Sequence, residues 1–278
     1  RRTIRTLCVV RYIIRKAVIA SVPEIEISAE EYALLGKARR VLSSALAIEE
    51  KYEILVANFL ALETELLRVA ARNTVRNTLS YSEFFETRST LNICLVNLLT
   101  AARLYLDQLP QDVADCIPEN LESATLVKAS SSQEYEKHFE YRFMEALRNH
   151  VQHRGIPIHF ISQGSHWTSL EEDGLMEFTV DIAAQRRYLE EDDKFKKAVL
   201  NEITSDVDLK AACRRYVESL STINEFARNL VAESTKSARE RIEAAHKQYA
   251  GIHSESLIGL TASALADGRE ISSVSLLL

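Results

Sequence analysis

The chain has 278 residues, of which 46% are hydrophobic and 27% charged, and its formal net charge is −6. Its seven glycines and four prolines amount to about 4% of the residues, against roughly 12% in average proteins. Such a scarcity of turn residues disfavours a β-sandwich or barrel, and the lack of a glycine-rich loop excludes a P-loop or Rossmann site. The composition predicts a protein built mostly from long helices.

The first 20 residues carry six basic side chains and no acidic one, so the remainder is more acidic than the net charge indicates. The β-branched run from Val9 to Ile19 favours a strand that packs on the body, and a targeting segment or a phosphate-binding arm is the alternative. We therefore treat residues 1–23 as a basic N-terminal strand or arm. After this segment, Ser28 and Glu31 form a capping-box pattern, which marks the start of a helix.

Three apolar seams, whose positions step by four and three residues, predict long helices that pack lengthwise. Few residues join these helices, so the expected fold is all-α, an antiparallel bundle in one domain over residues 24–250. Residues 251–278 are expected to form a tail, with a short helix as one option. The seams are Val41, Ala45, Ile48, Tyr52, Leu55, Phe59, Leu62, Leu66 and Val69; Leu91, Leu95, Leu98, Ala102, Tyr105 and Leu109, closed by Pro110; and Leu209, Cys213, Tyr216, Leu220, Ile223, Ala227 and Leu230.

A fourth helical segment is expected to begin near Ser132 and to end just before Gly155. Its apolar stripe runs through Phe139, Phe143 and Ala146, and the same steps lead to His150 and His153. Two imidazoles thus occupy positions where the other seams place apolar side chains. Arg148 and Asn149 flank this stripe, and Asn149 lies one turn before His153.

Three of the seven glycines lie in one window, from Gly155 to Gly174. On both sides of that window the apolar residues alternate with a period of two. This pattern predicts one small β-hairpin near 156–182, with strands over 156–162 and 175–182 and a polar loop that contains Trp167.

The segment Arg148-Asn149-His150-Val151-Gln152-His153 resembles the R-x4–6-H signature of the HEPN superfamily, in which a polar residue often follows the arginine. The spacing also occurs at Arg154–His159, Arg239–His246 and Arg241–His246. Only the pair from Arg148 to His153 combines this spacing with a polar neighbour, an apolar stripe and a helix end. Gly155 and Pro157 prevent a helix between Arg154 and His159. Arg239 and Arg241 lie on the polar tail of a helix with no apolar seam beside them.

The resemblance implies a largely helical, dimeric, metal-independent endoribonuclease with no cofactor, acting on RNA in a defence, toxin or RNA-processing setting. Arg148 would bind the phosphate and His153 would act as general base or acid, while Asn149 and His150 would orient the substrate or the histidine. These roles suit the side chains, since arginine matches phosphate and histidine titrates near neutral pH. Residues five apart on a helix point about 140° away from each other, so the mechanism calls for a homodimer or a distorted last turn.

Two other functions compete with this hypothesis. A non-catalytic helical interaction module, an inactive relative of the same superfamily, would use the seams and the polar helix over 231–249 for assembly. A metallohydrolase would draw on His150, His153, His159 and His166, with acidic residues near 171–173 in support.

Two further features bear on location and binding. The four cysteines are scattered and no run of 18 apolar residues occurs, so we expect a cytoplasmic protein with no membrane span. Residues 186–188 and 194–197 interleave basic and aromatic side chains as RNA-binding surfaces do, but the four acidic residues over 190–193 favour a solvated loop.

Overall fold

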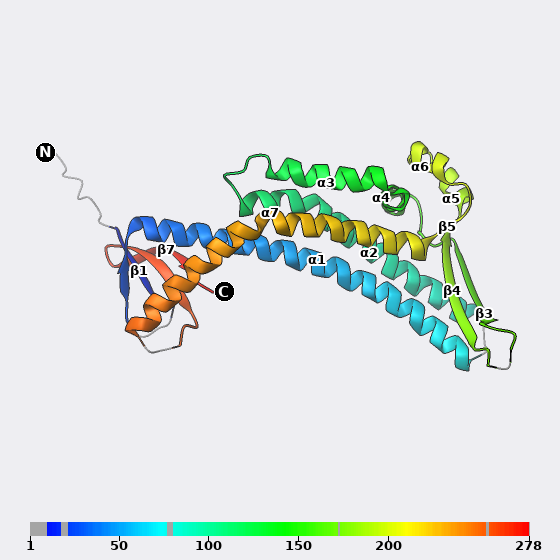
Figure 1. Cartoon of the computed structure of the whole chain (residues 1–278), viewed down its shortest axis with the longest axis horizontal. Helices are drawn as coiled ribbons and strands as arrows, with labels where there is room; N and C mark the ends of the chain where they lie inside the picture. The colour runs from blue at the N-terminus through cyan, green and yellow to red at the C-terminus, as the bar shows by residue number, and fades with distance from the viewer. Residues whose placement is uncertain (1–9, 18–21, 77–79, 172, 254–255, 278) are drawn as a thin grey trace. The chain divides into compact units, whose positions relative to one another are not determined.

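The structure, a computed structural model, describes residues 10–17, 22–76, 80–171, 173–253 and 256–277. Within them the chain forms seven helices and seven strands (Figure 1). The elements are β1 (Val10–Lys16), β2 (Ile25–Ile27), α1 (Ala29–Val75), α2 (Tyr81–Cys116), α3 (Ser123–Lys137), α4 (Phe139–His153), β3 (Phe160–Trp167), β4 (Met176–Ala184), α5 (Arg186–Glu190), α6 (Lys197–Glu202), β5 (Val207–Asp208), α7 (Leu209–Ile252), β6 (Leu260–Ala266) and β7 (Arg269–Ser275).

The predominance of helix is confirmed, but the expectation of a single small hairpin is wrong. The described strands form two antiparallel sheets, with the orders β2-β1-β6-β7 and β3-β4-β5. The chain divides into two compact units, one made of Arg1–Ile48, Gln111–Ser123 and Arg228–Leu278, the other of Glu49–Pro110 and Ala124–Ala227. An antiparallel bundle of all the long helices stays a prediction.

The first unit contains the four-stranded sheet. Strand β1 lies where a strand was expected in the basic N-terminal segment. Residues 1–9 of that segment lie outside the described part of the chain. The tail over 251–278 contains strands β6 and β7 rather than a short helix. The sequence signal for this hairpin is the pair Asp267-Gly268, since Asp-Gly is typical of tight turns between strands. In the structure both residues adopt positive φ angles, of 51° and 75°.

One hydrophobic core joins this sheet to the first turns of α1 and the last turns of α7. It includes Ile14 from β1, Leu35 from α1 and Tyr249 from α7, all almost fully buried. The predicted helix start is confirmed, because the Oγ atom of Ser28 accepts a hydrogen bond of 3.0 Å from the backbone N–H of Glu31.

The second unit contains most of the seam residues. Most seam positions are buried as predicted, and Ala45, Tyr52, Phe59 and Leu230 are partly buried. Every position of the second seam, from Leu91 to Leu109, is at most 1% exposed. Helix α2 nevertheless continues through Pro110 to Cys116, so the expected end at the proline is wrong. Proline removes one backbone hydrogen bond, but burial of Leu109 and Val113 on either side keeps the next turn in place.

The expected helix from Ser132 is in fact two helices, α3 and α4, which are separated at His138. His138 is extended, with φ −118° and ψ 122°. The guanidinium of Arg142 donates hydrogen bonds of 2.8 and 2.9 Å to the carbonyls of Tyr135 and Glu136, which satisfies acceptors at the end of α3. This local capping explains why the chain turns where the apolar pattern is continuous.

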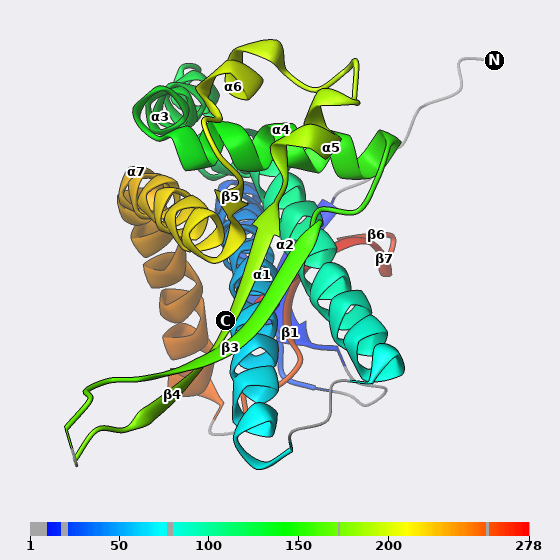
Figure 2. The same ribbon diagram turned by 90° about the vertical axis from the view of Figure 1, so that its right-hand side faces the viewer.

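The hairpin of β3 and β4 is confirmed, and Figure 2 shows it as a long two-stranded ribbon. Its first strand covers Phe160–Trp167 rather than 156–162, so Trp167 ends the strand instead of lying in the loop. The strand begins later than predicted because the preceding segment contacts α2. There the backbone N–H of Ile158 donates to Oδ1 of Asn92 at 3.0 Å. Strand β5 adds a third, very short strand beside the end of β4.

Helix α2 is also long and apolar enough, by length and composition alone, to cross a membrane. However, 44% of its most apolar window is buried inside the structure, and buried core helices pass the same test.

Candidate functional site

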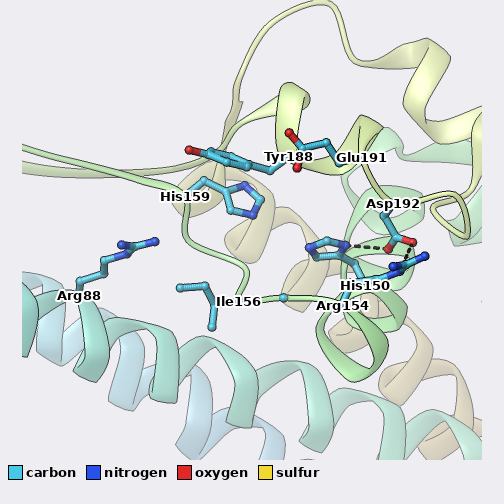
Figure 3. Close-up of a pocket in the computed structure, with 9 residues that line it drawn as sticks. Arg88, His150, Arg154, Ile156, His159, Tyr188, Glu191 and Asp192 are labelled. Atoms are coloured by element: carbon cyan, nitrogen blue, oxygen red, sulfur yellow. Dashed lines mark hydrogen bonds and ion pairs between the residues drawn. The ribbon is translucent and has the colours of Figure 1, made fainter.

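A pocket of about 390 Å³ lies in the second unit, where α2, the end of α4 and the segment after α5 come together (Figure 3). Two histidines, two arginines and two carboxylates line it, beside one tyrosine and an apolar wall. The lining residues are Arg88, His150, Arg154, Gly155, Ile156, His159, Tyr188, Glu191 and Asp192.

A buried pair of His150 and Asp192 forms one wall of the pocket. The Nδ1 atom of His150 lies 2.8 Å from Oδ2 of Asp192, and each residue is 5% exposed. Burial by itself raises the pKa of the Asp192 carboxyl, but the hydrogen bonds from His150 and from the backbone N–H of Lys194 outweigh it and lower that pKa on balance. Asp192 is therefore a carboxylate at neutral pH and holds the imidazole in one orientation.

This hydrogen bond also fixes which nitrogen of His150 serves the pocket. When Nδ1–H donates to the carboxylate, the neutral ring keeps its lone pair on Nε2. A Cβ atom built at Gly155 would lie 3.2 Å from Nε2, so the glycine leaves the approach to this nitrogen open. Arg154 adds positive charge beside the pair, since its Nε lies 3.4 Å from Oδ1 of Asp192 and its Nη2 contacts Asp193.

The second histidine of the pocket, His159, is held in the neutral form. Its Nδ1 accepts a hydrogen bond of 3.0 Å from the backbone N–H of Gln185, so the neutral ring carries its proton on Nε2. Burial, followed by the charges of His150 and Arg88, lowers its pKa to about 4. The ring centroid lies 4.9 Å from that of Tyr188 and 6.0 Å from that of His150.

Arg88 supplies a cation without a carboxylate partner among the described residues. Its side chain leaves α2 toward the pocket, and Figure 3 shows it on the opposite side from His150, with Ile156 between them. Its Nε atom is buried and makes no hydrogen bond within the described part of the chain. An arginine whose donors are unused and which faces a pocket is suited to binding an anionic oxygen, and above all a phosphate.

Of the four residues that the motif singled out, the structure places only His150 in this pocket. Arg148 is half-buried, and its Nη1 donates to Oδ1 of the neighbouring Asn149 at 3.0 Å. His153 is exposed and is the last residue of α4. The roles expected for Arg148, Asn149 and His153 stay predictions, and the exposed His153 is available to a second copy of the chain.

Sequence reasoning missed Arg88 and Asp192 as site residues, and it considered His159 only as a metal ligand. One signal was available for His159, because Arg154 and His159 repeat the R-x4–H spacing and both line the pocket although both lie beyond the last residue of α4. Arg88 and Asp192 carry no local signal, since one lies on a long helix and the other in an acidic run.

The metal hypothesis finds no ligand cluster here. The described residues contain no group of three or more His, Cys, Asp or Glu side chains arranged to hold a metal ion. Of the four histidines proposed for it, His166 lies on the hairpin, 3.2 Å from a carboxylate oxygen of Glu177. In the basic and aromatic stretch, Arg187 covers the ring of Tyr188 at 4.7 Å.

No protein-family model, curated protein or solved structure matches this chain.

Proposed function

We propose that the protein is a metal-independent endoribonuclease that cleaves RNA by attack of a 2′-hydroxyl on the neighbouring phosphate. The observation that supports the proposal most directly is the His150–Asp192 hydrogen bond in a pocket that also contains the unpaired Arg88. The pair provides an oriented base, and Arg88 provides a cation for the phosphate.

In this reaction His150 is the general base, Asp192 supports it, and Arg88 binds the phosphate. Nε2 of His150 accepts the proton of the 2′-hydroxyl, and the 2′-oxygen forms a bond to phosphorus. The bond from phosphorus to the 5′-oxygen breaks, which leaves a 2′,3′-cyclic phosphate, and the departing oxygen takes a proton from solvent. Asp192 stabilises the imidazolium that forms, and Arg88 stabilises the negative charge that grows on the phosphate.

The sequence motif supports the same reaction at a second place. Arg148 and His153 match the superfamily signature and lie in the last turns of α4, and neither lines the pocket. In that arrangement a homodimer would bring Arg148 of one copy near His153 of the other. The proposal is therefore RNA cleavage, with the pocket as the first choice of site and the dimeric motif as the second.

A cleavage assay with site variants tests the proposal. The protein is incubated with mixed single-stranded RNAs in EDTA, together with Arg88→Gln, His150→Gln, Arg148→Ala and His153→Ala. Arg215→Gln is the matched control, because Arg215 lies on α7 and pairs with Glu218 instead of lining the pocket.

We expect chelator-resistant cleavage that falls at least 100-fold in Arg88→Gln and His150→Gln and is unchanged in Arg215→Gln. Loss in Arg148→Ala and His153→Ala instead would keep the nuclease proposal and move its site to the dimeric motif. Absence of cleavage by the intact protein, with or without EDTA, would overturn the proposal. Cleavage that EDTA abolishes would overturn its metal-independent form.

The hairpin supports a second candidate function, the non-catalytic interaction module. Its tip presents Trp167, Leu170 and Leu175 with exposed fractions of 56%, 99% and 73%. Clustered exposed apolar side chains are typical of protein contacts. If the intact protein cleaves no RNA and a Trp167→Ser variant sediments as a smaller species, the tip is assigned to assembly; an unchanged sedimentation profile would remove this candidate.

A further inference from the structure

A second cavity, of about 400 Å³, adjoins the pocket and shares Arg88 and Ile156 with it. We call it the α2 groove, since α2 supplies all but one of its residues. They are Phe85, Arg88, Ser89, Asn92, Ile93, Val96, Asn97 and Ile156. All of them belong to the second unit.

The α2 groove differs from the pocket in being mainly apolar. Phe85, Ile93 and Ile156 are 61%, 59% and 46% exposed, and they recur along one face of α2 and on the segment beside it. An apolar surface that stays open to solvent in this way costs free energy unless a ligand covers it.

Polar groups at the rim of the groove have unused hydrogen-bonding capacity. The side chains of Ser89 and Asn97 make no hydrogen bond within the described part of the chain, and Asn97 is exposed. Asn92, in contrast, is occupied, because it accepts from Ile158 and donates to the carbonyl of Arg88. The free amide of Asn97 offers both a donor and an acceptor, as the edge of a nucleobase requires.

We propose that the α2 groove is a nucleobase subsite, which binds the base of the nucleotide whose phosphate lies at Arg88. The proposal rests on the proposed function in taking RNA as the source of the ligand. An apolar groove next to a single cation matches a nucleotide, in which a flat base is joined through the sugar to a phosphate. Phe85 provides an aromatic face for stacking, and Asn97 provides the hydrogen bonds to the base edge.

The position of Arg88 explains why the occupant is a nucleotide rather than an apolar peptide helix. Arg88 and Ile156 line both cavities, so a phosphate bound at Arg88 borders the groove as well as the pocket that contains His150. The base would thereby set which phosphate reaches the imidazole, and single-stranded RNA, whose bases are free to leave the stack, is the substrate class that fits.

Binding is tested with a ligand that the protein is unable to cleave. A dinucleoside monophosphate that lacks the 2′-hydroxyl carries base, sugar and phosphate but no nucleophile, and inorganic phosphate carries the charge alone. Calorimetric titrations compare both ligands with the full chain, Phe85→Ala, Ile93→Asp and Arg88→Gln. Leu67→Asp is the matched control, because Leu67 is 70% exposed on α1 and does not line the groove.

We expect Phe85→Ala and Ile93→Asp to weaken dinucleotide binding at least fivefold while phosphate binding stays unchanged. Arg88→Gln should weaken both ligands, and Leu67→Asp should weaken neither. Dinucleotide affinity that is equal in the full chain, Phe85→Ala and Ile93→Asp would overturn the subsite, whatever the RNA assay shows.

Two further outcomes separate this inference from the nuclease proposal. Groove-dependent dinucleotide binding by a protein that cleaves no RNA would retain the subsite and reject the proposed reaction. Loss of self-association in Ile93→Asp, with unchanged dinucleotide affinity, would assign the groove to a second copy of the chain and overturn the subsite.

Discussion

The hydrogen bond between Nδ1 of His150 and Oδ2 of Asp192 joins the last turn of α4 to the segment after α5, across 42 positions of sequence. Both side chains are almost fully buried, so the pair has a structural role as well as the chemical role proposed for it. A buried hydrogen bond is costly to break, because removal of one partner leaves the other desolvated and unsatisfied.

Substitution of either residue should therefore reduce the stability of the fold, and the effects of the two substitutions should not be additive. We expect His150→Gln and Asp192→Asn each to lower the melting temperature, and the double variant to lower it by less than the sum. The coupling free energy should be about 1–3 kcal/mol, since the two groups share one interaction. Thermal denaturation of the four proteins measures it.

His153→Gln is the control for that cycle, because His153 is exposed at the end of the same helix. It should change the melting temperature little. Strictly additive effects of His150→Gln and Asp192→Asn would show that the two side chains do not stabilise each other.

Gly155 provides a test of the pocket that changes no charge. A methyl group there would lie 3.2 Å from Nε2 of His150, closer than most such contacts. We expect Gly155→Ala to reduce RNA cleavage about tenfold or more, because small displacements of a base from its substrate slow proton transfer strongly. The rate is measured with single-stranded RNA in EDTA.

Gly164→Ala is the matched control, since its new methyl group would lie 3.8 Å from Thr179, an ordinary contact. It should leave the rate unchanged. Equal rates for Gly155→Ala and the unchanged protein would argue against Nε2 of His150 as the proton acceptor.

Asn92 holds the segment that separates the pocket from the α2 groove. It is 6% exposed, its Oδ1 accepts from the N–H of Ile158, and its Nδ2 donates to the carbonyl of Arg88. Asn92→Ala would leave the buried N–H of Ile158 unpaired, at a cost of about 1–3 kcal/mol. We expect the melting temperature to fall by about 2–4 °C for each kcal/mol.

The comparison variant is Asn97→Ala, on the same helix but exposed. It should melt close to the unchanged protein. A melting temperature for Asn92→Ala that equals that of Asn97→Ala would mean that Ile158 finds another acceptor.

The helices were predictable because their packing is periodic. From Leu91 to Leu109 each seam position is buried, since a repeat of four and three residues keeps one face of a helix against its neighbours. The predicted boundary at His138 failed because the apolar pattern does not record how the backbone groups at a helix end are satisfied, and here Arg142 binds the carbonyls at the end of α3. The sheet of the first unit was missed because its strands come from both ends of the chain.

The candidate site was predictable only in part, for the same reason. His150 stands out because a titratable ring interrupts an apolar stripe, and this signal is local. Asp192 lies 42 residues after His150 and Arg88 lies 62 residues before it, and neither residue carries a local sequence pattern that marks it as part of the pocket. The acidic run that contains Asp192 suggested a solvated loop, whereas that carboxylate is buried against the imidazole.

The neutral state of His159 predicts a pH dependence of stability. Burial, His150 and Arg88 lower its pKa to about 4, and only Asp206 and a backbone hydrogen bond act in the opposite direction. In the unfolded chain the ring titrates near pH 6.5. Between pH 6.5 and 4 the unfolded state therefore binds a proton that the folded state does not bind. The folded state thus loses stability as the pH falls through this window, and the loss levels off below pH 4.

A shift of one pKa unit corresponds to about 1.4 kcal/mol, and solvent screening of this half-buried ring reduces the total to about 1–2 kcal/mol. His159→Asn removes the titrating group and keeps an acceptor for the N–H of Gln185. We expect the melting temperatures of the two proteins to run parallel above pH 6.5 and to change relative to each other between pH 6.5 and 4, with the unchanged protein losing more. Parallel profiles over the whole range would show that His159 takes up its proton in the folded state as readily as in the unfolded chain.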